Sequence, residues 1–122
     1  MGNRRRVLGR RGEDLAVTYL QKQGYKLIMR NYRCLWGEID LIARDKGTLV
    51  FVEIKTRTSS EFGRPHEAVD RAKQRKLTQV ATAYLAERHV GEDVPARFDV
   101  VAIHLAPSGP QIQLIKDAFG LE

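Results

Sequence analysis

The sequence contains very little cysteine and no long hydrophobic run. Cys34 is the only cysteine among 122 residues, so a disulfide within one chain is excluded and a reducing compartment is expected. No apolar stretch is long enough to cross a bilayer. The basic start of the chain leads into Gly9-Arg10-Arg11-Gly12-Glu13 rather than into the apolar core of a signal peptide. We therefore expect a soluble, cytoplasmic protein.

Several kinds of functional site are also missing from the sequence. His66, His89 and His104 lie far apart along the chain, and Cys34 belongs to no recognisable metal-binding motif, which argues against a zinc site. Neither the glycine-rich phosphate-binding loop of P-loop proteins nor the dinucleotide fingerprint is present. Zinc, P-loop and nicotinamide chemistries are therefore not expected.

Positive charge exceeds negative charge in this otherwise ordinary globular composition. Apolar residues make up 43% and charged residues 30% of the chain, and the formal net charge is +6. The length predicts a single domain over residues 1–122, with a basic, flexible segment at residues 1–8. A basic balance favours a polyanionic partner, although a solvated basic tail and helix face would give the same composition. Among nucleic acids, DNA is expected more than RNA. The expected nucleic-acid contacts are Arg10, Arg11, Arg57, Arg71, Lys73 and Lys76.

Apolar periodicity and turn residues divide the chain into seven elements. Helical spacing predicts helices over residues 9–23 and 67–89, and Gly24 supplies the stop of the first helix. The segment from Thr58 to Pro65 has the composition of a loop. Strands are predicted over residues 25–33, 36–43, 48–57, 98–105 and 111–116.

The order α-β-β-β-α-β-β predicts an α/β fold with a mixed central sheet flanked by helices. A strand, a long helix and a second strand imply a parallel crossover, whereas the earlier strands form antiparallel hairpins. The tetrapeptide Arg44-Asp45-Lys46-Gly47 is expected to form the turn of the hairpin between the second and third strands. Pro110 places the last strand at an edge, where pairing into a homodimer is an open alternative.

The hairpin closed by this turn carries two carboxylates and a lysine. Side chains alternate along a strand, and a four-residue turn would place Asp40 opposite Phe51 and Glu38 opposite Glu53. Asp40 and Glu53 would then be diagonal neighbours on one face, and Lys55 would share the face of Glu53. The competing interpretation is an exposed strand on which a Glu/Lys pair is merely solvated.

Crowded carboxylates on adjacent strands repel each other unless a cation lies between them. Mg²⁺ (or Mn²⁺) suits such a place because it prefers oxygen ligands and often uses only one or two carboxylates, with water and substrate phosphate completing its shell. Lys55 is then placed to orient or deprotonate the attacking water, or to hold the phosphate. We therefore expect Asp40 and Glu53 to be metal ligands and Lys55 to be catalytic.

Two further charged residues occupy apolar helix faces, where an unpaired charge is costly. Glu13 lies in line with Ala16, Val17 and Leu20, so it is expected to be a further catalytic residue and metal ligand, or a helix-terminal Glu that is favoured by the helix dipole. Lys73 precedes Leu77 by one helical turn. It is expected either to contact a phosphate or to extend its ammonium group from the edge of the apolar helix face into water.

Taken together, the motifs resemble the YraN-type family of bacterial proteins. That family is similar to archaeal Holliday-junction resolvases and to the wider restriction-endonuclease-like superfamily. The resemblance implies a nuclease fold with a divalent cation, and it aligns Glu13, Asp40, Glu53 and Lys55 with the catalytic positions. In the nominal superfamily pattern a proline precedes the aspartate, and here that position is Ile39. The motifs are Gly9-x-x-Gly12-Glu13, Asn31-Tyr32-Arg33, Gly37-Glu38-Ile39-Asp40-Leu41-Ile42, Phe51-Val52-Glu53-Ile54-Lys55-Thr56-Arg57 and Lys73-Gln74-x-Lys76-Leu77, where x is any residue and position 75 is Arg75.

Three hypotheses follow for function. The first is a metal-dependent endonuclease that hydrolyses phosphodiester bonds in DNA, branched or single-stranded, in repair or recombination. The second is a non-catalytic nucleic-acid-binding module on the same scaffold. The third is an interaction protein with no nucleic-acid partner. The complete carboxylate, carboxylate and lysine set favours the first.

Overall fold

The computed structural model describes residues 3–58 and 69–121, and it describes side chains from Gly9 onward. His66, most of the predicted loop and the first residues of the predicted second helix lie outside the described residues. The elements are α1 (Asn3–Lys22), β1 (Lys26–Cys34), β2 (Gly37–Asp45), β3 (Thr48–Arg57), α2 (Arg71–Glu87), β4 (Ala96–Ala106) and β5 (Gly109–Phe119).

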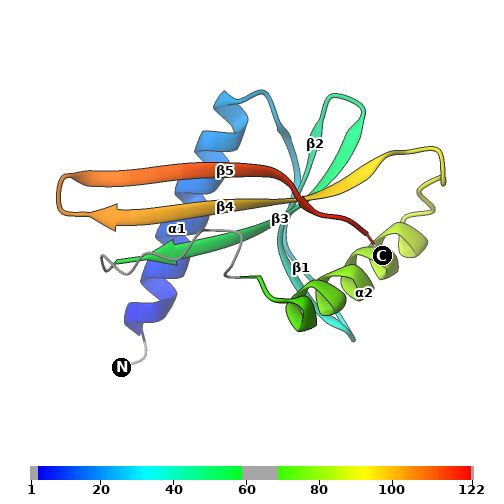
Figure 1. The fold of residues 1–122 in the computed structure, drawn as a ribbon, viewed down its shortest axis with the longest axis horizontal. Helices are drawn as coiled ribbons and strands as arrows, with labels where there is room; N and C mark the ends of the chain where they lie inside the picture. Colours follow the sequence, from blue (N-terminus) through cyan, green and yellow to red (C-terminus); the bar gives the residue numbers. More distant parts are fainter. Residues whose placement is uncertain (1–2, 59–68, 122) are drawn as a thin grey trace.

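The strands form one mixed sheet in the order β1-β2-β3-β4-β5. The pair β3–β4, which α2 connects, is parallel, and the other neighbours are antiparallel. Figure 1 shows the sheet twisting strongly, with α1 crossing the β3–β4–β5 end and α2 lying near β1. The predicted element order and mixed sheet are confirmed, and they are consistent with a restriction-endonuclease-like fold.

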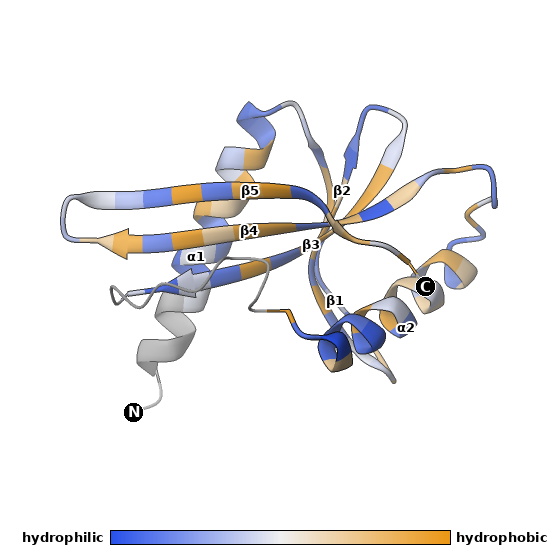
Figure 2. Ribbon diagram, in the orientation of Figure 1, coloured by the Kyte–Doolittle hydropathy of each residue, from blue (hydrophilic) through white to orange (hydrophobic). Residues whose placement is uncertain are grey.

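The two helices cover separate apolar clusters of the sheet. Ala16 and Leu20 of α1 pack with Leu41, Val50 and Val52 in one cluster. The other cluster contains the buried face of α2 together with alternate residues of the same strands: Ile42, Leu49, Phe51, Leu77, Val80, Ala81, Tyr84 and Phe98. Hydrophobic and hydrophilic bands alternate along β4 and β5 in Figure 2, as the period of two in a strand requires.

Both helices begin elsewhere than predicted. α1 begins at Asn3, six residues before the predicted start at Gly9. α2 begins at Arg71 rather than at Glu67, because Asp70 caps it: the Asp70 carboxylate accepts a hydrogen bond of 2.9 Å from the backbone N–H of Lys73. Gly24 follows α1 with a φ of 95°, which confirms the predicted stop.

The strands β4 and β5 run longer than predicted but occupy the expected positions. Pro110 pairs with Leu105 at the start of β5, and β5 is an edge strand, where a residue without a backbone N–H is tolerated. In the part of the chain that the structure describes, no helix is long and apolar enough to cross a membrane.

Candidate functional site

Asp40 and Glu53 come together where β2 and β3 separate. The last pair of the ladder on this side is Leu41 with Val52, so Asp40 and Glu53 are the next residues in register. Instead of a further backbone pair, the Asp40 carboxylate accepts a hydrogen bond of 2.8 Å from the backbone N–H of Ile54. Glu53 is buried, with 5% of its surface exposed. The two carboxylates therefore meet in a poorly hydrated position.

The predicted hairpin register is wrong by two residues. Asp45 pairs with Thr48, and the turn is Lys46-Gly47 with Lys46 at a φ of 57°, whereas the prediction made all four residues from Arg44 the turn. The strand continues through Asp45 because the Asp45 carboxylate accepts a hydrogen bond of 2.7 Å from Arg97. Asp40 consequently lies across from Glu53 rather than from Phe51.

Glu38 does not face Glu53, contrary to the predicted register. Its carboxylate instead forms an ion pair of 2.5 Å with Arg33 on the neighbouring strand. The correction leaves the candidate site intact, because it brings Asp40 and Glu53 into direct opposition rather than a diagonal relation.

The proximity of the two carboxylates changes the protonation of Asp40. Burial, together with the neighbouring Glu53 carboxylate, raises the pKa of Asp40 to about 8, and the hydrogen bond from Ile54 offsets only part of this effect. At neutral pH the pair therefore favours carrying one negative charge rather than two. A cation bound between the carboxylates would restore the second charge.

Two lysines approach Glu53 from different elements. The Nζ of Lys73 on α2 lies 2.8 Å from Oε2 of Glu53, and the Nζ of Lys55 on the same strand lies 3.9 Å from it. Contact with the Glu53 carboxylate raises the pKa of Lys73. Among the described residues, none donates to the buried Oε2 of Glu53 in hydrogen-bonding geometry, so its contacts are ionic and it retains accepting capacity.

The contact with Glu53 explains why Lys73 lies on the apolar face of α2. The sequence offered a phosphate or an extended, solvated ammonium group as its environment, but the partner present in the structure is Glu53. Because Lys73 lies in the first turn of α2, the cap formed by Asp70 also fixes how far this lysine reaches over the sheet. The sequence places Lys55 and Glu53 on one face of β3, and their ion pair agrees with it.

Glu13 lies beside this site and is occupied by other partners. Its carboxylate accepts hydrogen bonds of 2.6 Å from Arg30 and 3.0 Å from Asn31. Asn31 falls opposite Asp40 in the β1–β2 register, between the pairs Arg30–Leu41 and Tyr32–Ile39. The partners of Glu13 are therefore Arg30 and Asn31 rather than Asp40 or Glu53. Over residues 3–58 and 69–121, no three acidic, histidine or cysteine side chains gather closely enough to hold a metal ion.

Asn31 marks a change of face in β1 that the sequence pattern did not reveal. Arg30 reaches Glu13 and Asp14 of α1, yet Tyr32, only two residues later, packs in the α2 cluster. Asn31 between them has a φ of 54°, a left-handed conformation that asparagine tolerates better than most residues. The signal available beforehand was an Asn inside an alternating strand.

The basic residues predicted to bind nucleic acid are divided between the two helices and β3. Lys73 and Lys76 line a groove of about 240 Å³ beside the β1–β2 turn. Arg71 borders a depression of about 420 Å³ near the start of α2. Arg57 lies at the end of β3. Arg10 and Arg11 lie on α1, where they border a shallow depression.

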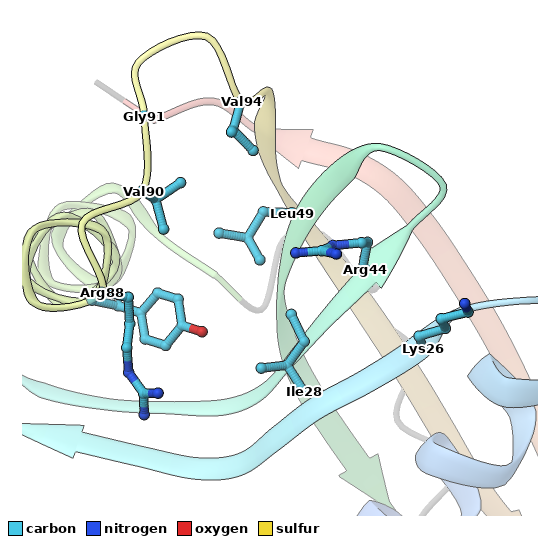
Figure 3. Close-up of a pocket in the computed structure, with 9 residues that line it drawn as sticks. Lys26, Ile28, Arg44, Leu49, Arg88, Val90, Gly91 and Val94 are labelled. Carbon is cyan, nitrogen blue, oxygen red and sulfur yellow. The ribbon is translucent and has the colours of Figure 1, made fainter.

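A separate groove of about 550 Å³ lies at the other end of α2 (Figure 3). Leu49, Val90 and Val94 give it apolar walls, and Arg44 and Arg88 contribute cationic side chains. It contains none of the predicted catalytic residues, so size alone does not identify the candidate site.

Comparisons with known proteins find one family. A family model described as "Uncharacterised protein family UPF0102" matches residues 12–103, a range that includes all four predicted catalytic residues. A UPF0102 protein of Geobacter metallireducens is 50% identical over 114 residues, covering 93% of each chain. A UPF0102 protein of Symbiobacterium thermophilum is 50% identical over 115 residues, covering 93% of this chain and 97% of the relative. One from Syntrophus aciditrophicus is 48% identical over 113 residues, covering 93% and 88%.

Proposed function

From its membership of the UPF0102 family, the YraN-type family that its motifs indicated, and from its buried carboxylate pair, we propose that this chain is a divalent-metal-dependent endonuclease that hydrolyses phosphodiester bonds in DNA. Branched or single-stranded DNA in repair or recombination is the substrate class. The cytoplasm is the proposed location, because the lone Cys34 suits a reducing compartment.

The observation that carries the proposal is the conflict between Asp40 and Glu53. Two carboxylates side by side at low hydration cost free energy, and the raised pKa of Asp40 reports that cost. A fold that needed only a stable core would avoid this pair. Mg²⁺ or Mn²⁺ fits the donors present: two carboxylates are a sufficient protein contribution, and Oε2 of Glu53 has accepting capacity left.

A bound divalent ion at these carboxylates would supply stabilisation of charge on the phosphoryl oxygens and a lower pKa for bound water. The chain supplies the rest of the chemistry. Asp40 and Glu53 hold the ion, and the Ile54 N–H fixes the orientation of Asp40. Lys55 lies beside Glu53 with 27% of its side chain exposed, so it can orient water or hold the scissile phosphate. Lys73 compensates the charge of Glu53 and lies ready for a neighbouring phosphate.

Glu13 is proposed as an additional ligand that joins when substrate and metal arrive. In the structure its carboxylate is held by Arg30 and Asn31, and 37% of the Arg30 side chain but only 17% of the Glu13 side chain is exposed. A divalent ion that binds Glu13 would have to replace Arg30 as its partner.

The substrate proposal rests on charge. A net charge of +6 favours a polyanion, and Arg57, Lys73 and Lys76 are the nearest candidates for phosphate contacts, with Arg71, Arg10 and Arg11 further along the helices. DNA affinity should therefore fall with added salt, because each phosphate contact releases counterions. A homodimer formed through the β5 edge is compatible with this proposal but is not needed for it.

The test is cleavage of linear, single-stranded and four-way DNA with Mg²⁺ or Mn²⁺. Asp40→Asn, Glu53→Gln and Lys55→Ala should each reduce cleavage on the order of 10²-fold or more, while circular dichroism shows an intact fold. Glu38→Gln is the matched control, because it removes a carboxylate from the same strand whose ion pair is with Arg33 rather than with Lys55 or Lys73. Cleavage that survives all three substitutions, or that needs no divalent ion, would refute the assignment.

The second candidate is a nucleic-acid-binding module without turnover. It is favoured by the pairing of Lys73 with Glu53 and by the absence of a third metal-ligating side chain at the pair among the described residues. Isothermal titration of Mn²⁺ separates the candidates. Binding that Asp40→Asn abolishes supports the nuclease, whereas DNA binding without metal binding or cleavage supports the module.

A further inference from the structure

The β1–β2 turn presents apolar side chains to water. Leu35 is 93% and Trp36 53% exposed, and both lie between the paired residues Cys34 and Gly37. Two-residue hairpin turns favour Gly, Asn and Asp for conformational reasons. Leucine and tryptophan give a turn no such advantage, so these side chains are better explained by something that they contact.

The turn is held against α2 in a fixed orientation. A Cβ added to Gly37 would lie 3.4 Å from a methyl group of Val80, and Gly37 has a φ of 140°. The groove of about 240 Å³ between the turn and the helix is lined by Trp36, Lys73 and Lys76. Glu38 also lines it, and its carboxylate is paired with Arg33. An exposed indole therefore lies beside two ammonium groups.

The groove and the carboxylate site share Lys73. Lys73 lines the groove, and its Nζ also lies 2.8 Å from Glu53. A chain of phosphates that follows Lys76 and Lys73 would therefore arrive at Asp40 and Glu53.

An indole next to paired ammonium groups matches one kind of partner well. A nucleobase stacks on the aromatic face while lysines neutralise the flanking phosphates. In a duplex both faces of a base are already covered, so only an unpaired base offers a free face. An acidic peptide with an apolar side chain would use the cations but would not need a planar surface.

We propose that Trp36 stacks on an unpaired base of single-stranded nucleic acid whose phosphates Lys73 and Lys76 hold. This inference rests on the proposed nuclease function for its location, and it makes the substrate of that site a single strand or the unpaired part of a branched one. Leu35 borders the stacked base without being required for it.

The experiment uses the full chain in EDTA, so that no cleavage occurs and the result is independent of catalysis. Trp36 is the only tryptophan, and its fluorescence therefore reports on this site alone. Oligothymidine should quench it, whereas an abasic oligonucleotide of equal length should bind more weakly and quench little. Fully paired duplex should leave the fluorescence nearly unchanged.

Labelled oligothymidine measured by anisotropy gives the energetic test. Trp36→Ala should weaken binding on the order of 10-fold or more, Trp36→Phe should restore most of the loss, and Leu35→Ala should change it little. Equal affinity of wild type and Trp36→Ala, or equal affinity for abasic and normal strands, would overturn the proposal. So would unchanged DNA binding together with a loss of self-association in Trp36→Ala, which would identify the turn as a protein contact. If the chain shows no cleavage but Trp36 still stacks on unpaired bases, only the nuclease proposal is refuted.

Discussion

Two clusters of buried polar groups lie on the same sheet, and they are built in opposite ways. In one, Asp99 is fully buried and its carboxylate accepts hydrogen bonds of 2.7 Å from Tyr25, 2.9 Å from Arg97 and 2.9 Å from the backbone N–H of Asp117. Arg97 also donates to Asp45. Charges of opposite sign meet, and the Asp99 oxygens have several donors each.

The cluster of Asp40 and Glu53 shows the contrary pattern. Two carboxyl groups face each other here, and burial together with Glu53 raises the pKa of Asp40 to about 8. The ammonium groups of Lys73 and Lys55 both contact Glu53. Arg97 in the other cluster instead holds the pKa of Asp45 below its usual value. Burial of a carboxylate is therefore common to both clusters, whereas repulsion between neighbouring carboxylates distinguishes the cluster of Asp40 and Glu53.

The largest expected effect is at Asp99. Asp99→Ala should destabilise the fold by about 3–5 kcal/mol, because it removes one partner of a buried ion pair and leaves the Tyr25 hydroxyl and the Asp117 N–H without their acceptor. Chemical denaturation measures this loss, and Tyr25→Phe, which removes only one hydroxyl donor, should cost about 1 kcal/mol. A loss below that of Tyr25→Phe would show that the cluster of Asp99 and Arg97 is not structural.

The position of α1 over the site end of β3 depends on Gly12. A Cβ there would overlap the Oγ1 of Thr56, whereas a Cβ at Gly9 meets nothing within 4 Å. Gly12→Ala should therefore cost about 1–3 kcal/mol, and Gly9→Ala, its control on the same helix, should stabilise by up to about 1 kcal/mol. Thermal denaturation compares them. Adding Thr56→Ala should rescue Gly12→Ala, and failure of that rescue would contradict the steric explanation.

The repulsion between Asp40 and Glu53 predicts a pH dependence of stability. The folded pKa of Asp40, about 8, exceeds the unfolded value, so the folded state holds the proton more tightly and stability should fall as pH rises toward 8. The slope is at most about 1.4 kcal/mol per pH unit for one proton.

Urea denaturation in EDTA from pH 5 to 8.5 measures that slope. Asp40→Asn should flatten it, because the amide still accepts from Ile54 and carries no charge, whereas Glu38→Gln should change it only slightly, because Glu38 is the weakest of the groups that raise the pKa of Asp40. Parallel slopes for wild type and Asp40→Asn would show that the two carboxylates do not repel each other.

The smallest effect is expected at Asp45. Asp45→Asn should cost about 1–2 kcal/mol at neutral pH, because it weakens the charge-assisted bond from Arg97. The pKa of Asp45 is lowered in the folded state, so this stabilisation is present above the unfolded pKa and is lost as pH falls through the folded one. The difference between variant and wild type should therefore vanish in acid. A difference that persists there would place its origin outside the ion pair.

Much of the fold and part of the site are predictable from local patterns. Alternation identified β3, and Glu53 and Lys55 share a face because they are two residues apart on it. The hairpin brought Asp40 near them even though its turn was assigned wrongly, since a shift of two residues preserves the face of every side chain. Helix boundaries are harder to predict. The apolar pattern predicts the start of the second helix at Glu67, whereas the Asp70 cap places the first residue of α2 at Arg71.

Periodicity and neighbours close along the chain are sufficient to predict the order of elements, the mixed sheet and the hairpin that carries Asp40, Glu53 and Lys55. Which buried charges find partners depends instead on contacts between residues far apart along the chain. Asp99 looks as anomalous as Asp40 in an apolar strand, yet Asp99 meets Tyr25, 74 positions away. Glu13 and Lys73 likewise acquired their partners through packing, because the position of a helix over a sheet is set by the whole core.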